Sequence, residues 1–249
     1  KGFLIGGTAG RTTLNGEGLQ HQDGHSHLIA STIPNLKAYD PAYSYEIAVI
    51  IQYGMKIMYK ENQDVFFYLT LENENYVHPK FPDNIEDGII KGMYKLINSE
   101  PSKMSVQLLG SGPILNEVIL ASKLLKKDWG IDSDVWSVTS YSELHKDAEN
   151  ATRWNLLNPE KDKKISYLED SLDNSKGPII ACSDYVKLVS EQISPYINCD
   201  FTSIGTDGFG RSGSREELRD FFEINKYYIT LAAVHALRKQ NKVDEMLVQ

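Results

Sequence analysis

Three of the chain's six histidines lie within seven residues of one another, in a glycine-rich segment spanning residues 16–27. His21, His25 and His27 alternate there with Asp23, and no amphipathic period runs through the segment. This pattern is typical of a loop that presents side chains. Imidazole titrates close to neutral pH, so such a cluster is suited to acid–base catalysis or to metal binding. We therefore take residues 16–27 as the first candidate for a functional site.

Metal binding by His21, Asp23, His25 and His27 is one chemistry that these residue types could support. Imidazole and carboxylate are ligands of zinc and other transition ions, and alternate residues of an extended segment can point the same way. The spacing differs from the helical pair of histidines with an intervening glutamate. The remaining histidines are isolated in the sequence: His78, His145 and His235. A metal-dependent hydrolase and a loop with a catalytic histidine both stay open on the residues alone.

A second glycine-rich segment, GFGRSG at residues 208–213, matches the dinucleotide-binding pattern. It follows an expected strand and precedes an expected helix. About twenty residues further on, however, the chain has Ala233 instead of the acid that the pattern requires. We interpret the segment as a loop that its glycines permit.

Two other candidates have simpler structural interpretations. Cys182 ends an expected strand, and small cysteines are common inside sheets, so we expect it in the core. Arg11, Thr12 and Thr13 could bind an anion, but we favour turn capping by the threonines and a surface charge for the arginine.

Hydrophobic periodicity predicts the elements that position these segments. Strands are expected at residues 2–7, 65–71, 106–109, 135–139, 179–182 and 201–204, and helices at residues 41–60, 114–127, 184–193 and 225–239. Asp40 and Pro41 resemble an N-cap and a first helical residue. Ser140 with Glu143, and Ser214 with Glu217, are capping-box patterns at the starts of two further helices.

The stretch from residue 72 to residue 104 carries Pro79, Pro82 and Pro101 and is expected to be a connector, with a domain boundary near residue 100. From there on, strands and helices alternate. This alternation predicts an α/β fold with a mostly parallel sheet.

Composition narrows the class of protein. The chain has 249 residues, 41% hydrophobic and 24% charged, with a net charge of −8, which is typical of a soluble globular protein. The acidic balance disfavours nucleic acid as a partner, and no run approaches the roughly 18 apolar residues of a membrane span. Cys182 and Cys199 are too few for a disulfide framework, so we expect a reduced, cytoplasmic protein. The chain starts at Lys1 inside an expected strand, which suggests a piece of a longer polypeptide.

Several long motifs carry a resemblance to a known family. The run GGTAGRTTLNGEGLQHQDGHS at residues 6–26 closely resembles the homodimeric, bacterial type of pyruvate dehydrogenase. That protein is the thiamine diphosphate-dependent, decarboxylating component of the pyruvate dehydrogenase complex. The resemblance continues through YDPAY, ENENY, LLGSG, SVTS and GTDGFGRS, at residues 39–43, 72–76, 108–112, 137–140 and 205–212.

The resemblance implies a C-terminal segment of that enzyme. Residues 1–75 would be the tail of the aminopyrimidine-binding middle domain, residues 76–104 a linker, and residues 105–249 a transketolase C-terminal-like α/β domain. The intact enzyme uses thiamine diphosphate and Mg²⁺, whose binding motif is absent from this segment, so the segment alone is expected to be inactive. Implied partners are pyruvate, a second copy of the chain and the dihydrolipoyl acetyltransferase core.

The resemblance also singles out His21. In related thiamine enzymes a glycine-rich loop ends in a His-Gln pair that reaches the substrate, and His21-Gln22 matches that pair. His21 is therefore the expected catalytic residue, with Gln20, Asp23 and His25 shaping the loop around it. No metal ligand and no cofactor-binding residue is expected in this segment. Two alternatives remain: the metal-dependent hydrolase, and a non-catalytic assembly domain centred on residues 100–249.

Overall fold

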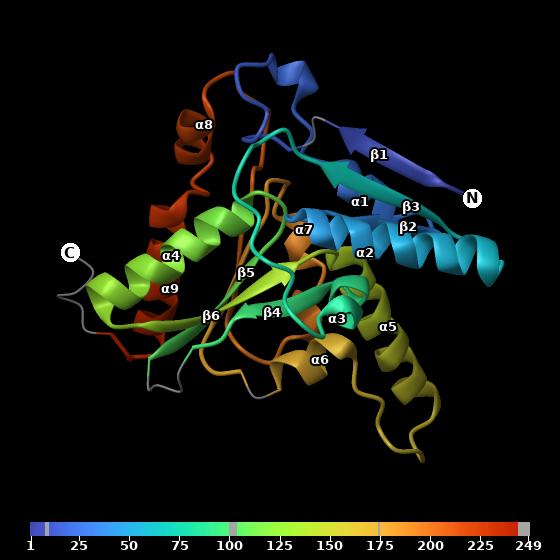
Figure 1. Ribbon diagram of the computed structural model, residues 1–249. Coiled ribbons are helices and arrows are strands. Elements are labelled where there is room, and N and C mark those ends of the chain that lie inside the picture. Colours follow the sequence, from blue (N-terminus) through green and yellow to red (C-terminus); the bar gives the residue numbers. More distant parts are fainter. Residues whose placement is uncertain (8–9, 100–103, 174, 244–249) are drawn as a thin grey trace.

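A computed structural model gives the architecture of the chain and describes residues 1–7, 10–99, 104–173 and 175–243 (Figure 1). The strands of these ranges form two sheets. One has three strands in the order β1-β3-β2, and the other has five in the order β4-β6-β5-β7-β8. All neighbouring strands are parallel except β4 and β6. The predicted α/β class and mostly parallel sheet are confirmed.

The first sheet is covered on both faces. Its strands are β1 (Phe3–Gly7), β2 (Leu36–Tyr39) and β3 (Phe66–Leu71). One face packs against α2 (Ser44–Met55), its π-helical continuation η2 (Lys56–Lys60) and α3 (Glu86–Lys91), with Phe67 and Leu69 fully buried. The other face carries α1 (Ser26–Ser31).

The second sheet contains β4 (Met93–Ile97), β5 (Ser105–Gly110), β6 (Asp132–Val138), β7 (Ile179–Cys182) and β8 (Phe201–Ile204). Helices α4 (Ile114–Trp129) and α9 (Lys226–Lys239) cover one face, and α5 (Tyr141–Leu157), α6 (Tyr167–Leu172) and α7 (Leu188–Glu191) cover the other (Figure 1). All six residues of β5 are buried: Val106 and Leu108 belong to the α4–α9 core, whereas Leu109 faces α5. Burial on both faces is what a central parallel strand requires.

Two predicted helix starts are confirmed. The Ser140 hydroxyl caps α5 by accepting a hydrogen bond from the Glu143 backbone N–H at 3.1 Å. The Ser214 hydroxyl caps α8 (Arg215–Phe221) by accepting from the Glu217 backbone N–H, and the Glu217 carboxylate accepts in turn from the Ser214 backbone N–H. Cys182 lies in the core as expected, with no exposed surface.

Three local expectations are wrong: the start of α2, the connector at residues 72–104, and the length of the helix expected at residues 184–193. Helix α2 begins at Ser44 and not at Pro41, because the Asp40 carboxylate is used elsewhere and Glu46 accepts from the N–H groups of Ala42 and Tyr43 instead.

The stretch taken as a connector contains α3 and β4, and β4 extends the second sheet through β6. The helix expected at residues 184–193 is reduced to α7 and is followed by a 3₁₀ turn, η3 (Ser194–Tyr196). Across the described ranges, none of the helices has the length and apolar character that crossing a bilayer demands.

Candidate functional site

The carboxyl ends of parallel strands from both sheets meet in one polar seam. Asp40 follows β2, Ser111 follows β5 and Asp184 follows β7. Ser111 donates a hydrogen bond to Asp40 across the seam at 2.8 Å. Loops at the carboxyl ends of parallel strands are where α/β proteins build ligand sites, so this seam is the candidate site.

The histidine-rich segment leaves the carboxyl end of β1 and lies beside the connection to α8, at the top of Figure 1. Its middle forms a 3₁₀ turn, η1 (Leu19–His21). His21 ends this turn and is exposed, as is Gln20, whereas Gln22 is buried. The expected catalytic residue, His21, is therefore accessible, and the residue after it, Gln22, is held in place by a hydrogen bond from the Arg211 N–H.

Asp23 and His25 belong to the start of α1. The Asp23 carboxylate accepts hydrogen bonds from the backbone N–H groups of His25 and Ser26, at 3.0 and 2.9 Å. The His25 ring is exposed, and its Nδ1 lies 3.4 Å from the Arg11 guanidinium. Asp23 thus shapes the backbone that follows His21.

His27 is buried in the seam. Its Nε2 lies 3.0 Å from the Thr70 hydroxyl, and its ring packs edge-on against Tyr185 at 4.6 Å between centroids. Burial lowers the pKa of His27 to about 4, against the opposing charge of Asp23. The ring is therefore neutral at physiological pH.

The four side chains of the metal hypothesis are not brought together: His21 is exposed, Asp23 caps α1 and His27 packs in the seam. Within the described ranges, no three His, Cys, Asp or Glu side chains form a group that could hold a metal ion. The geometry does not support the metal-dependent hydrolase.

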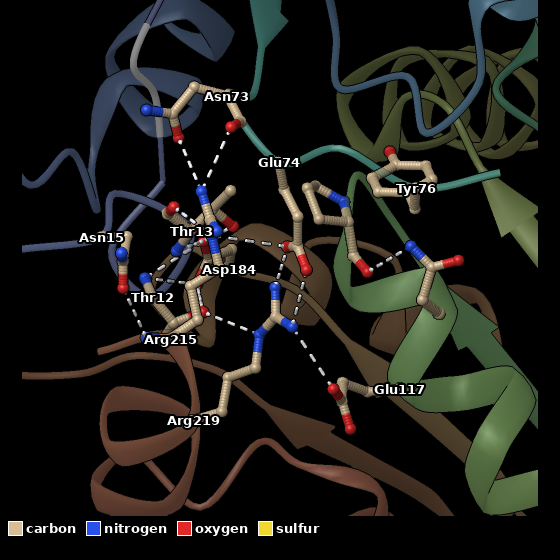
Figure 2. A network of polar contacts seen from close by, with 12 residues as sticks. Thr12, Thr13, Asn15, Asn73, Glu74, Tyr76, Glu117, Asp184, Arg215 and Arg219 are labelled. Atoms are coloured by element: carbon tan, nitrogen blue, oxygen red, sulfur yellow. Dashed lines mark hydrogen bonds and ion pairs between the residues drawn. The ribbon is translucent and has the colours of Figure 1, made fainter. Parts of the chain in front are cut away.

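Thr12 and Thr13 do bind an anionic group, and that group is the carboxylate of Asp184 in the same chain. Their backbone N–H groups and hydroxyls donate to the two oxygens of the Asp184 carboxylate at 2.7–3.2 Å (Figure 2). Burial raises the pKa of Asp184, and these hydrogen bonds oppose the shift.

The surface charge expected for Arg11 is wrong: Arg11 is 3% exposed. Its guanidinium donates to the backbone carbonyls of Thr206 and Gly208. Arg11 thereby binds the segment after β1 to the loop that follows β8.

Figure 2 shows a second layer of contacts around the threonines. Arg215 donates to the Thr13 carbonyl at 2.8 Å, and Arg219 pairs with the carboxylates of Glu74 and Glu117. Arg219 is buried. Helix α8 is therefore joined by charge to the chain that leaves β3.

Two more carboxyls lie in the seam, the buried Asp40 and the half-buried Glu72. Asp40 accepts from Thr70 and Ser111, and burial raises its pKa to about 6 despite these bonds. Glu72 accepts from the Tyr185 hydroxyl at 3.3 Å, and its pKa is raised well above the ordinary value by burial and by the nearby Asp40 and Asp184. Sequence reasoning missed Asp40, Glu72 and Asp184 as seam residues. The signal was available, since each follows a strand end closely.

The glycine-rich segment at residues 208–213 is a loop between β8 and α8, as interpreted from the sequence. Its backbone faces the histidine-rich segment: Gly16 donates to the Gly213 carbonyl at 3.0 Å, and the Arg211 N–H donates to Gln22 at 2.6 Å. The loop is thus occupied by contacts with the chain itself.

Comparison with known proteins agrees with this architecture. Residues 1–79 match the family model described as the pyruvate dehydrogenase E1 component middle domain, and residues 92–225 match the transketolase-like C-terminal domain. A transketolase mutant from Pichia stipitis superposes with a TM-score of 0.67 at 18% identity, covering 97% of this chain and 31% of that one. A split-gene transketolase superposes at 0.61 with 13% identity, covering 95% and 66%. The fold is that of the transketolase-like α/β proteins.

Sequence relatives are more specific. The pyruvate dehydrogenase E1 component of Pseudomonas aeruginosa is 54% identical over 249 residues, covering 99% of this chain. That of Escherichia coli K12 is 50% identical over 250 residues, covering the whole chain. The chain belongs to the pyruvate dehydrogenase E1 family, which confirms the resemblance found in the motifs. It spans 28% of the length of each of these relatives.

Proposed function

We propose that this chain is the part of a pyruvate dehydrogenase that carries the substrate-side histidine loop, with His21 as the catalytic residue. The carrying observation is the exposure of His21 at the end of η1, next to a buried, anchored Gln22. Asp23 and His25 support the loop, and Gln20 lies exposed beside them. The family supports an enzyme over a non-catalytic assembly domain.

In this proposal the full-length enzyme decarboxylates pyruvate and transfers the acetyl group to the lipoyl group of the acetyltransferase. Negative charge develops on the keto oxygen of pyruvate during the reaction. An imidazole can donate a proton to that oxygen and accept one in the transfer step. His21 is proposed to hold this proton.

We propose that the residues that bind the diphosphate of the cofactor and Mg²⁺ belong to the part of the longer enzyme outside this chain. The described ranges contain no group of His, Cys, Asp or Glu side chains arranged for a metal ion, and the Asp184 carboxylate is bound by Thr12 and Thr13. The chain alone is accordingly expected to be inactive.

The proposal includes the organisation of the whole enzyme. Residues 1–75 complete the aminopyrimidine-binding domain, and residues 105–249, with β4 added to their sheet, form the transketolase C-terminal-like domain. The enzyme is expected to act as a cytoplasmic homodimer with the dihydrolipoyl acetyltransferase core as its partner.

The test is His21→Ala in the full-length enzyme. Loss of a general acid–base group should lower acetyl transfer by roughly 100- to 10,000-fold, while thiamine diphosphate affinity stays nearly unchanged. His235→Ala is the matched control, because His235 is exposed on α9. Full activity of the His21 variant would refute the assignment.

A further inference from the structure

His21 and Gln22 are adjacent, yet their side chains lie in opposite environments. His21 is exposed, and Gln22 is only 8% exposed. The Gln22 amide makes both of its hydrogen bonds to the backbone of one residue, Arg211. Its Nε2 donates to the Arg211 carbonyl, and its Oε1 accepts from the Arg211 N–H at 2.6 Å.

The loop at residues 205–213 lies closely against this side chain. A Cβ added at Gly210 would lie 2.5 Å from Gln22 Oε1 and 3.1 Å from the Leu19 carbonyl oxygen. The loop therefore contacts both Gln22 and the backbone of η1, the turn that ends in His21. Only a glycine leaves room for this approach.

Two further residues hold the same loop through three hydrogen bonds. Arg11 donates to the carbonyls of Thr206 and Gly208, and Gly16 donates to that of Gly213. The backbone of the loop is thus bound along its length by the segment that follows β1. The loop after β8 thus packs against η1 and supports it.

We infer that Gln22 is a positioning residue, and that the loop at residues 205–213 sets the place of His21 in the active centre. The inference rests on the proposed catalytic role of His21. The inference means that the second sheet contributes to catalysis by positioning His21 through the loop after β8, although none of its residues is proposed to react. Displacing a catalytic group by about 1 Å can cost on the order of 100-fold in rate, so the position of η1 should affect turnover directly.

The first experiment replaces Gln22 in the full-length enzyme. Gln22→Met keeps a side chain of similar length but removes both hydrogen bonds to Arg211. We expect kcat to fall by about 10- to 100-fold, with KM for pyruvate within about twofold and an unchanged melting temperature. Gln63→Met is the matched control, because Gln63 is exposed and precedes β3, at the end of the sheet away from the seam. A kcat equal to that of the control would overturn the inference.

The second experiment tests whether Gln22 acts through His21. If it does, adding Gln22→Met to His21→Ala causes little further loss, because the group being positioned is already gone. If the two losses multiply, Gln22 acts independently and the inference is wrong. His21→Ala alone decides the catalytic assignment, so the two failures are distinguishable.

Gly210→Ala approaches the same contact from the opposite side. The added methyl group meets Gln22, so this variant should also lower kcat. Combining it with Gln22→Ala should lower kcat little beyond the loss of Gln22→Ala alone, because the contact between the two residues is already gone. A Gly210→Ala enzyme with unaltered kcat would count against this support of η1 even if the Gln22 variants failed to fold.

Discussion

Thr12 and Asp184 are 172 residues apart in the sequence but are joined by hydrogen bonds from the Thr12 backbone N–H to both carboxylate oxygens, at 2.9 and 3.2 Å, and from the Thr12 hydroxyl at 2.7 Å. Thr13 repeats the arrangement at the other oxygen of the carboxylate. The two threonines follow β1 and Asp184 follows β7, so this carboxylate joins the two sheets (Figure 2). Four buried donors depend on one acceptor group.

Asp184→Ala should therefore be strongly destabilising. It leaves buried donors unpaired, each at a cost of about 1–3 kcal/mol before relaxation, and we expect a loss of roughly 3–5 kcal/mol in the free energy of unfolding. Asp184→Asn retains one acceptor oxygen and should lose about half as much. Urea unfolding of the two variants checks the order. Asp162→Ala, in an exposed loop, is the control; an Asp184→Ala chain as stable as that control would contradict the prediction.

Hydrogen bonds link His27 to Thr70 and Thr70 to Asp40. The two titratable groups, His27 and Asp40, should make the free energy of unfolding depend on pH in opposite directions. The folded pKa of Asp40 is raised to about 6, so its contribution to stability is present below about pH 4 and is lost as the pH rises towards 6. The folded pKa of His27 is lowered to about 4, so its contribution is present above about pH 6.5 and is lost as the pH falls towards 4. Each shift corresponds to roughly 3 kcal/mol, and in the parent chain the two nearly cancel.

Replacing either Asp40 or His27 should reveal the pH dependence of the unfolding free energy that the remaining group causes. Between pH 4 and pH 6.5 the unfolding free energy of Asp40→Asn should rise relative to the parent by up to about 3 kcal/mol. His27→Gln should fall relative to the parent over the same range by a similar amount. Denaturant unfolding at several pH values measures both, with the exposed Asp83→Asn as the control. Parallel curves for parent and variants would show that neither group titrates as described.

The two cysteines should differ completely in reactivity. Cys182 is fully buried in β7, whereas Cys199 is exposed. Burial raises the pKa of both thiols, and Asp200 adds to the shift at Cys199. Because only the exposed thiol can be reached, a maleimide should modify Cys199 alone in the native chain and both cysteines after unfolding. Mass spectrometry of the labelled protein distinguishes these products, and Cys199→Ser should abolish native labelling. Native modification of Cys182 would contradict its placement in the core.

Long periodic elements were predictable from the sequence because their own residues determine them. The helix at α4, the buried strand β5 and the caps at Ser140 and Ser214 depend on local spacing and hydrogen bonds. Asp40 was misjudged because its carboxylate has a distant competitor: it accepts from Thr70 and Ser111 instead of capping a helix.

The candidate site was predictable only in part. The family motif indicated the histidine loop, but local sequence could not show which imidazoles are exposed. Arg11 and Thr12 were misread for the same reason, because their partners, Thr206 and Asp184, come from the far end of the chain. Long-range contacts of this kind have no local sequence signal.

The carboxyl ends of the parallel strands meet in the seam, so a residue just before such a strand lies at the other end of its sheet. Cys199 lies just before β8 begins at Phe201, at the amino end of that strand, whereas the loop that supports η1 leaves its carboxyl end. A fluorophore or a surface tether on Cys199 would therefore be separated by the length of the sheet from the histidine loop. The exposed Cys199 is thus a native labelling site remote from the proposed catalytic residue.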